Sequence, residues 1–159
     1  MVANRPSIDF PKDGRLSPVA LDIQKGVCRL LRTHGFAPVT ELTLGNGRRA
    51  DVAAVDGNGA LVIVEIKSSL EDFRSDNKWQ DYLDHCDQLY FAVSRDFPAD
   101  ILPTEAGLII ADKYGGEILR SPPENKLPGS RRKAVLLRFS RTAALRLHDL
   151  YDPDANRSG

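Results

Sequence analysis

The sequence predicts an α/β domain in which helices cover both faces of a mixed central sheet. Short apolar runs rich in Val, Ile and Ala alternate with turn residues over residues 37–66, as expected of three consecutive strands. Helical spacing of apolar residues occurs before and after these strands, over residues 17–35, 77–86 and 131–151. Ser17, Asp76 and Ser130 are candidate N-caps of these helices, and Pro18 suits the first helical position. Residues 68–75 should form a loop or partial turn. A fourth strand at 88–94 follows a helix, so it should run parallel to the third through a right-handed crossover.

The length and charge of the chain limit its organisation and its partners. With 159 residues it is large enough for one domain with a substantial core. We expect a polar lead-in over 1–16, the domain over 17–151 and a disordered tail over 152–159. Lys and Arg together number 22, as do Asp and Glu, so the net charge is zero. DNA binding would therefore need local basic patches, or cations that bridge acids to phosphate.

The two cysteines and the N-terminal residues indicate a cytoplasmic protein. Cys28 and Cys86 lie far apart, without the spacing of a metal site, and each stands in an apolar pattern. We interpret them as buried free thiols in a reducing compartment rather than as a disulfide. The first residues contain no long apolar stretch, so we expect neither a signal peptide nor contact with a membrane.

Two identical loops set the register of the first three strands. The triplet Gly-Asn-Gly stands at residues 45–47 and again at 57–59. Such loops suit three-residue hairpin turns closed by a glycine in the left-handed region. Turns of this kind pair Leu44 with Arg48, and Asp56 with Ala60. A two-residue turn would instead move acids of neighbouring strands to opposite faces.

The three-residue register brings three acids together. Glu41 stands opposite Asp51, and Asp51 stands opposite Glu65, with neighbours about 5 Å apart. Lys67, two residues beyond Glu65, points to the same side. Carboxylates gathered at the end of a buried sheet repel one another unless a cation neutralises them, and Mg²⁺ prefers such oxygen ligands. The competing interpretation is three unrelated, solvated strand-end acids with Lys67 as an ordinary edge lysine.

Both faces of the three strands are expected to be buried, because each is apolar over most of its length. The face with the acids carries Val39, Ala53, Val55, Leu61 and Ile63. The opposite face carries Leu42, Leu44, Val52, Ala54, Val62, Val64 and Ile66. Helices should therefore lie on each side of the sheet.

Asp51, followed by Glu65-Ile66-Lys67, resembles the PD-(D/E)xK signature of the restriction-endonuclease-like superfamily, with Ala50 in place of the proline. A longer stretch, GRRADVAAVDGNGALVIVEIKSSLEDFRSDNKWQDYLDHCDQLYFAV, is more specific. It continues through FPADILP, GLIIAD and YGGEIL. Over residues from about 17 to 150 the chain resembles the MmcB-like family of bacterial DNA repair proteins.

The resemblance implies a restriction-endonuclease-like α-β-β-β-α-β core with an added C-terminal helix. It implies Mg²⁺-dependent cleavage of a DNA phosphodiester, as by an endodeoxyribonuclease, with Mn²⁺ as a substitute. Asp51, Glu65 and the carbonyl of Ile66 would hold the cation, and Glu41 would complete the shell. Lys67 would orient the attacking water and offset charge growing on the phosphorus.

The helices flanking the sheet also contribute to such a site. Superfamily members often carry a polar residue from the second helix into it. Lys78, Gln80 or Tyr82 would fill this role and contact the substrate, although each also suits a helix with a core stripe and a solvated face. Resolvase-like members use an acid of the first helix. Gln24 falls nearest that position and brings no charge, while Asp22 lies close by and also suits a helix's first turn.

Basic residues offer contacts to DNA phosphates. Arg48 and Arg49 rank first because they adjoin the acids. The last helix adds a basic set that could equally serve solubility: Arg131, Arg132, Lys133, Arg138, Arg141 and Arg146. His85 fits a helix end better than a ligand. The expected partner is damaged, branched or single-stranded DNA, and symmetrical cutting of two strands would favour a homodimer.

Two other functions stay open. The chain could be a DNA-binding or partner-binding module that keeps the nuclease fold without turnover. It could also be a metal-dependent hydrolase of RNA or nucleotides, although the sequence shows no Gly-rich phosphate loop. The intact set of Asp51, Glu65 and Lys67 favours the nuclease.

Overall fold

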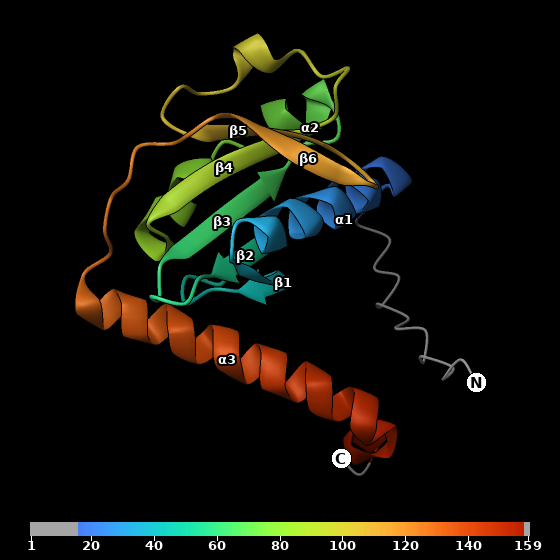
Figure 1. Cartoon of the computed structure of the whole chain (residues 1–159), viewed down its shortest axis with the longest axis vertical. Coiled ribbons are helices and arrows are strands. Elements are labelled where there is room, and N and C mark those ends of the chain that lie inside the picture. Colours follow the sequence, from blue (N-terminus) through green and yellow to red (C-terminus); the bar gives the residue numbers. More distant parts are fainter. Residues whose placement is uncertain (1–15, 158–159) are drawn as a thin grey trace.

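A computed structural model describes residues 16–157 and shows a six-stranded sheet with helices on both faces (Figure 1). The strands are β1 (Ala37–Thr43), β2 (Arg49–Val55), β3 (Leu61–Ile66), β4 (Gln88–Val93), β5 (Gly107–Asp112) and β6 (Gly115–Arg120). The α-helices are α1 (Pro18–Thr33), α2 (Leu70–Ser75) and α3 (Gly129–Tyr151). The 3₁₀ helices are η1 (Trp79–His85), η2 (Ala99–Ile101) and η3 (Pro153–Arg157).

The sheet is mixed, with its strands in chain order from β1 to β6. The pairs β1–β2, β2–β3 and β5–β6 are antiparallel, whereas β3–β4 and β4–β5 are parallel. The order α1-β1-β2-β3-α2-β4 is the predicted core, so the α/β fold class is confirmed. The expected lead-in lies outside the described residues except for Leu16.

Both hairpin loops have the predicted form. The Leu44 N–H donates to the Arg48 carbonyl at 2.7 Å, and the Asp56 N–H donates to the Ala60 carbonyl at 3.1 Å. The closing glycines, Gly47 and Gly59, have φ angles of 82° and 84°. Only glycine adopts this region without strain, so the two loops fix the register of β1, β2 and β3 as the sequence predicts.

The strand β1 departs from the prediction at Glu41. Its φ is 52°, and it interrupts a ladder in which Thr40 pairs with Val52 and Leu42 with Ala50. A residue in this region reverses the alternation of side chains along a strand. The face predicted for Leu42 and its neighbour Leu44 is therefore wrong.

These two leucines pack with the side chains that were expected on the other face of the sheet. Leu42 and Leu44 share a core cluster with Ala53 and Ile63. The remaining residues of the second predicted face do lie together against α1, namely Val52, Ala54, Val62, Val64 and Ile66.

Helix α1 covers one face of the sheet, as its apolar spacing predicts. Its first turn is capped by Ser17, whose hydroxyl accepts the Ala20 N–H at 3.1 Å, and Pro18 follows the cap. Ile23, Val27 and other buried residues of α1 face the sheet. The opposite face is covered by η1, by the segment after β4 and by Phe139 of α3.

The region after β3 differs from its prediction. The prediction was a loop or partial turn over 68–75 and a helix over 77–86, with Asp76 as its candidate N-cap. Instead α2 occupies Leu70–Ser75, and the second helix is the 3₁₀ helix η1. Ser69 caps α2 by accepting the Asp72 N–H at 3.1 Å, so local capping decided this segment.

Helix α3 extends along the edge of the domain beyond β1 (Figure 1). It starts after Pro128, without a side-chain cap, so the predicted cap at Ser130 is wrong. Its residue Arg132 bonds both Asp87 oxygens, at 2.6 and 2.7 Å. This arginine therefore serves the fold, which argues against its predicted role at a phosphate.

Three smaller predictions can be compared with the structure. Cys28 and Cys86 are free cysteines, as expected, but only Cys86 is buried and Cys28 is half-buried. The tail was predicted to be disordered from residue 152, but η3 forms over Pro153–Arg157. Within residues 16–157, no helix combines the length and apolar character needed to cross a membrane.

Helix α1 crosses β5 and β6 so closely that Gly26 has no space for a side chain. A Cβ at this position would stand 1.8 Å from the carbonyl oxygen of Asp112. Helix propensity alone would make Gly26→Ala stabilising by up to ~1 kcal/mol. We expect destabilisation by ~1–3 kcal/mol instead, because the helix must shift away from the sheet.

Chemical denaturation checks this expectation, with Gly57→Ala as the matched control. A Cβ at Gly57 meets nothing within 4 Å. Equal stability of the two variants would contradict the close packing of α1.

Candidate active site

Most of the predicted site residues line one cavity of about 1500 Å³ at the end of the sheet. Its walls come from α1, the first three strands, the segment after β3 and the C-terminal part of α3. The predicted residues that line it are Glu41, Arg48, Arg49, Asp51, Glu65, Ile66, Lys67 and Tyr82.

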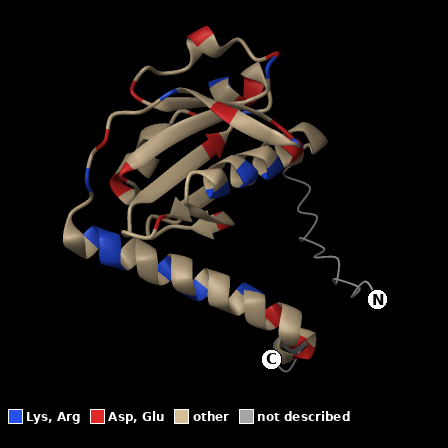
Figure 2. Cartoon of the chain, viewed as in Figure 1, with Lys and Arg blue, Asp and Glu red and all other residues tan. Residues whose placement is uncertain are grey.

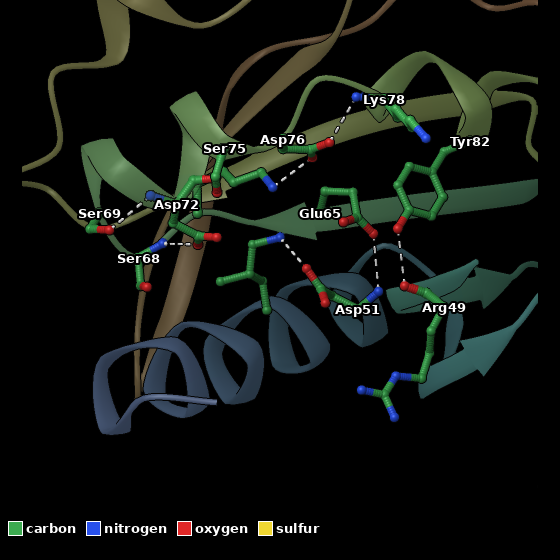
Figure 3. A network of polar contacts seen from close by, with 12 residues as sticks. Arg49, Asp51, Glu65, Ser68, Ser69, Asp72, Ser75, Asp76, Lys78 and Tyr82 are labelled. Atoms are coloured by element: carbon green, nitrogen blue, oxygen red, sulfur yellow. Dashed lines mark hydrogen bonds and ion pairs between the residues drawn. The ribbon is translucent and has the colours of Figure 1, made fainter. Parts of the chain in front are cut away.

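The Asp51 and Glu65 carboxylates each accept a backbone N–H across the ends of β2 and β3 (Figure 3). The backbone ladder between β2 and β3 ends at Val52 and Val64. Beyond this pair, carboxylate side chains accept the backbone N–H groups. The Asp51 N–H donates to Glu65 Oε1 at 3.1 Å, and the Ile66 N–H donates to Asp51 Oδ2 at 2.8 Å. These two bonds use one oxygen of each carboxylate.

The backbone carbonyl of Ile66 belongs to the same group of oxygens. A strand residue directs its N–H and its C=O to the same side. Since the Ile66 N–H reaches Asp51, its carbonyl also faces the gap where β2 and β3 separate. Two carboxylates and one carbonyl are thus available on adjacent strands.

The two carboxyl groups are strained electrostatically. Burial raises the pKa of Asp51 to about 6, and the charge of Glu41 adds to this, although the Ile66 N–H and Lys67 oppose it. Burial and the charge of Asp51 raise the pKa of Glu65 well above its usual range. Glu65 is only 4% exposed. The pair would be stabilised in its charged form by a nearby cation.

The donor chemistry of Asp51, Glu65 and the Ile66 carbonyl fits a hard divalent cation such as Mg²⁺. Glu41 does not complete this set, because its Oε2 is 2.9 Å from Arg49 Nε and its Oε1 accepts from Gln24. Across residues 16–157 no group of three or more His, Cys, Asp or Glu side chains is arranged to hold a metal ion. In this structure Glu41 is thus bound to Arg49 and Gln24, and its part as a third ligand stays a prediction.

Lys67 stands at the end of β3 with its amine bound to an acid that the sequence did not suggest. Its Nζ lies 2.7 Å from Asp76 Oδ2, and the lysine is 5% exposed. Burial opposes ionisation of Asp76. The hydrogen bonds from Lys67 and from the Lys78 N–H, with the charges of Lys67 and Arg48, together outweigh burial and hold the pKa of Asp76 below its ordinary value. Asp76 is therefore charged at neutral pH.

Tyr82 and the two arginines close the other side of the cavity. The Tyr82 hydroxyl donates to the Arg49 carbonyl at 3.1 Å. Burial, with the charges of Glu65 and Asp51, raises the pKa of Tyr82, so the phenol stays a neutral donor. Arg48 bonds Asp81 at 2.9 Å and lies over the Tyr82 ring, 5.8 Å from its centre.

Each of the two helices considered in the sequence analysis contributes one of its candidate residues to the site. On α1, Gln24 enters the site and donates to Glu41 Oε1 at 3.3 Å and to the Asp51 carbonyl at 3.2 Å. Asp22 is exposed and does not line the cavity. On the second helix Tyr82 enters, whereas Lys78 and Gln80 are exposed and lie outside the cavity lining.

Sequence reasoning missed three acids of the lining, Asp72, Asp76 and Asp149. The signal for Asp72 was its place three residues after Ser69, which is the spacing of a capping box. Asp72 also accepts the Ser68 N–H at 3.1 Å. Asp76 has no comparable signal, because its contact with Lys67 depends on how the chain folds back.

Comparison with known proteins gives the family. The family model described as DNA repair protein MmcB-like matches residues 8–154. The chain belongs to the MmcB-like DNA repair family. No curated protein matches the chain.

A solved structure resembles this MmcB-like chain closely. It is described as a protein of unknown function, SPO1766, from Silicibacter pomeroyi. The two chains are 45% identical, and the similarity covers 89% of this chain and 96% of the other, with a TM-score of 0.84. The MmcB-like fold therefore extends over nearly the whole of both proteins.

The coupled carboxyl pair predicts an unusual pH dependence of stability. The folded-state pKa of Asp51 is about 6 against 3.8 for the ordinary group, so the folded protein binds the proton more tightly. Stability should then fall as pH rises from about 4 to 6. Asp51→Asn keeps a hydrogen-bond acceptor and removes the charge.

We expect Asp51→Asn to raise the melting temperature at pH 7.5 by ~3 °C or more and to flatten the dependence between pH 4 and 6. Thermal melts in chelator measure this. Adding Mg²⁺ or Mn²⁺ should stabilise the parent protein and leave Asp51→Asn little changed. A variant less stable than the parent at pH 7.5 would contradict the electrostatic strain.

Proposed function

We propose that this MmcB-like protein is a Mg²⁺-dependent nuclease that hydrolyses DNA phosphodiesters during repair. The observation that carries the proposal is the buried Asp51–Glu65 pair, placed beside the Lys67 amine in one cavity. Family membership supports a role in DNA repair. The sheet geometry supports hydrolysis, because the pair presents oxygen donors where an anionic substrate can enter.

Asp51 and Glu65 would hold the cation through the carboxylate oxygens that do not accept a backbone N–H. The Ile66 carbonyl would add a neutral ligand. When bound, the cation would polarise the scissile phosphate and favour formation of the attacking hydroxide. Mn²⁺ would serve as a substitute, because it also prefers carboxylate and carbonyl ligands.

Lys67 would bind a non-bridging phosphate oxygen and offset the charge that grows on it during attack. An ammonium on a flexible stem can follow an oxygen that moves during the reaction. Arg48 and Arg49 line the entrance and would contact the DNA backbone on either side of the scissile bond. Tyr82 holds the Arg49 backbone in place through its hydroxyl.

The proposed substrate is damaged, branched or single-stranded DNA, cut internally by a cytoplasmic enzyme. The cavity favours a short or locally unpaired DNA segment over a long duplex, because its arginines are paired with acids of the protein and offer little net positive charge to a DNA backbone. Arg48 is bound to Asp81, and Arg49 is bound to Glu41. A homodimer would place two such cavities for cutting two strands.

A DNA-binding module without turnover is the second candidate, and one observation favours it. The amine of Lys67 is already engaged by Asp76, and the third acid, Glu41, is engaged by Arg49. A chain that only binds DNA would keep these ion pairs in the complex.

Cleavage assays separate the two functions. Purified protein is incubated with branched, nicked and single-stranded DNA in Mg²⁺ or Mn²⁺. We expect cleavage by the parent protein and a loss of ~10²-fold or more in Lys67→Ala, because the phosphate loses its charge partner. Asp51→Ala should be inactive and should not respond to the cation.

The matched control is Lys113→Ala, which removes an exposed lysine between β5 and β6. It should cleave as the parent does. Cleavage that persists in both site variants would come from elsewhere, and binding without cleavage by the parent would support the second candidate.

A further inference from the structure

Asp76 is an acid of the cavity that the proposed chemistry does not use, although it contacts the amine that the chemistry needs (Figure 3). The distance from Lys67 Nζ to Asp76 Oδ2 is 2.7 Å. The two side chains are only 6% and 14% exposed. An ammonium group has three N–H donors, so the contact with Asp76 uses one and leaves two to face the cavity.

Local structure fixes Asp76 without help from Lys67. The Asp76 N–H donates to the Phe73 carbonyl at 3.1 Å and so ends α2. Its Oδ1 accepts the Lys78 N–H at 3.1 Å, which directs the carboxylate as the chain turns into η1. Phe73 packs edge-on against Phe91 of β4, with ring centres 5.9 Å apart. The carboxylate therefore stands on an anchored segment.

Lys67 has other acids within electrostatic reach. Its charge acts on both Asp51 and Glu65, as the causes of their pKa shifts show. A lysine stem has four flexible carbons, and without a fixed partner the amine would turn to these carboxylates. In that position it would neutralise the oxygens that suit a cation and would leave the place where a phosphate can meet it.

We propose that Asp76 is a positioning residue, which holds the Lys67 amine away from the Asp51–Glu65 pair and directs it to the substrate phosphate. The consequence for cleavage rests on the proposed function, whereas the anchoring of the amine can be measured without it. The sequence pattern of the nuclease signature ends at Lys67, so this assignment adds a residue nine positions further along the chain.

The anchoring is tested on the full chain by ¹⁵N–¹H NMR of lysine ammonium groups. Such signals persist only where solvent exchange is slowed by a buried ion pair, and Lys67→Ala identifies the signal. We expect the signal in the parent and its loss in Asp76→Asn. The matched control is Asp56→Asn, since Asp56 also accepts the N–H two residues ahead, at 2.9 Å, but lies in the second hairpin loop.

Two further readouts separate positioning from folding. Mn²⁺ binding to Asp76→Asn should weaken by ~10-fold, because the released amine competes at Asp51 and Glu65. In the cleavage assay kcat should fall by ~10- to 100-fold while KM stays within about twofold. Asp76→Glu should restore part of kcat, and Asp56→Asn should match the parent in all three measurements.

An ammonium signal that survives in Asp76→Asn would overturn the proposal, as would unchanged Mn²⁺ binding together with unchanged kcat. Higher kcat in Asp76→Asn would also overturn it and would show that Asp76 restrains Lys67. If the parent protein does not cleave DNA, the nuclease function fails, while the NMR and Mn²⁺ measurements still decide the anchoring.

Discussion

The site depends on two hydrogen bonds in which the Asp51 and Glu65 carboxylates accept backbone N–H groups across β2 and β3. Where the β2–β3 ladder ends, each carboxylate accepts a backbone N–H of the neighbouring strand in place of a carbonyl. A hydrogen bond to a backbone N–H favours the charged carboxylate, whereas burial and the second charge oppose it. The result is a rigid pair of acids whose charge is not balanced by the fold, which is a suitable arrangement for a cation.

The irregularity of β1 lies beside this pair, since the charge of Glu41 acts on Asp51. At Glu41 the positive φ interrupts the β1–β2 ladder, and such a conformation costs ~1–3 kcal/mol unless its surroundings hold it. Gln24 of α1 binds the Glu41 side chain, and Arg146 of α3 binds the carbonyls of Thr40 and Glu41. Contacts at this irregular part of β1 thus link the first helix, the sheet and the last helix beside the cavity.

Several arginines of the cavity and of α3 are bound to other parts of the chain. Figure 2 shows Lys and Arg along α3, yet Arg132 is bound to Asp87 and Arg146 is bound to β1. The exposed Arg131, Lys133 and Arg141 remain on the surface of α3. A neutral protein with a balanced cavity is consistent with binding that depends on a cation and on a local DNA structure, rather than on long-range attraction.

The sequence by itself determined the strands, their register and the neighbourhood of Asp51, Glu65 and Lys67. It did so because these features depend on local rules: the Gly-Asn-Gly loops fix the pairing, and alternation along a short strand fixes the side chains. The capped first helix followed from Ser17 and Pro18 for the same reason.

Only the tertiary structure decided which charges meet. Glu41 turns to Arg49 because the backbone reverses at that residue, and Lys67 meets Asp76 because α2 and η1 fold back over the end of β3. Leu42 and Leu44 moved to the other face with the same reversal. Such contacts join residues through long-range packing, and neither spacing nor composition encodes the path by which the chain returns.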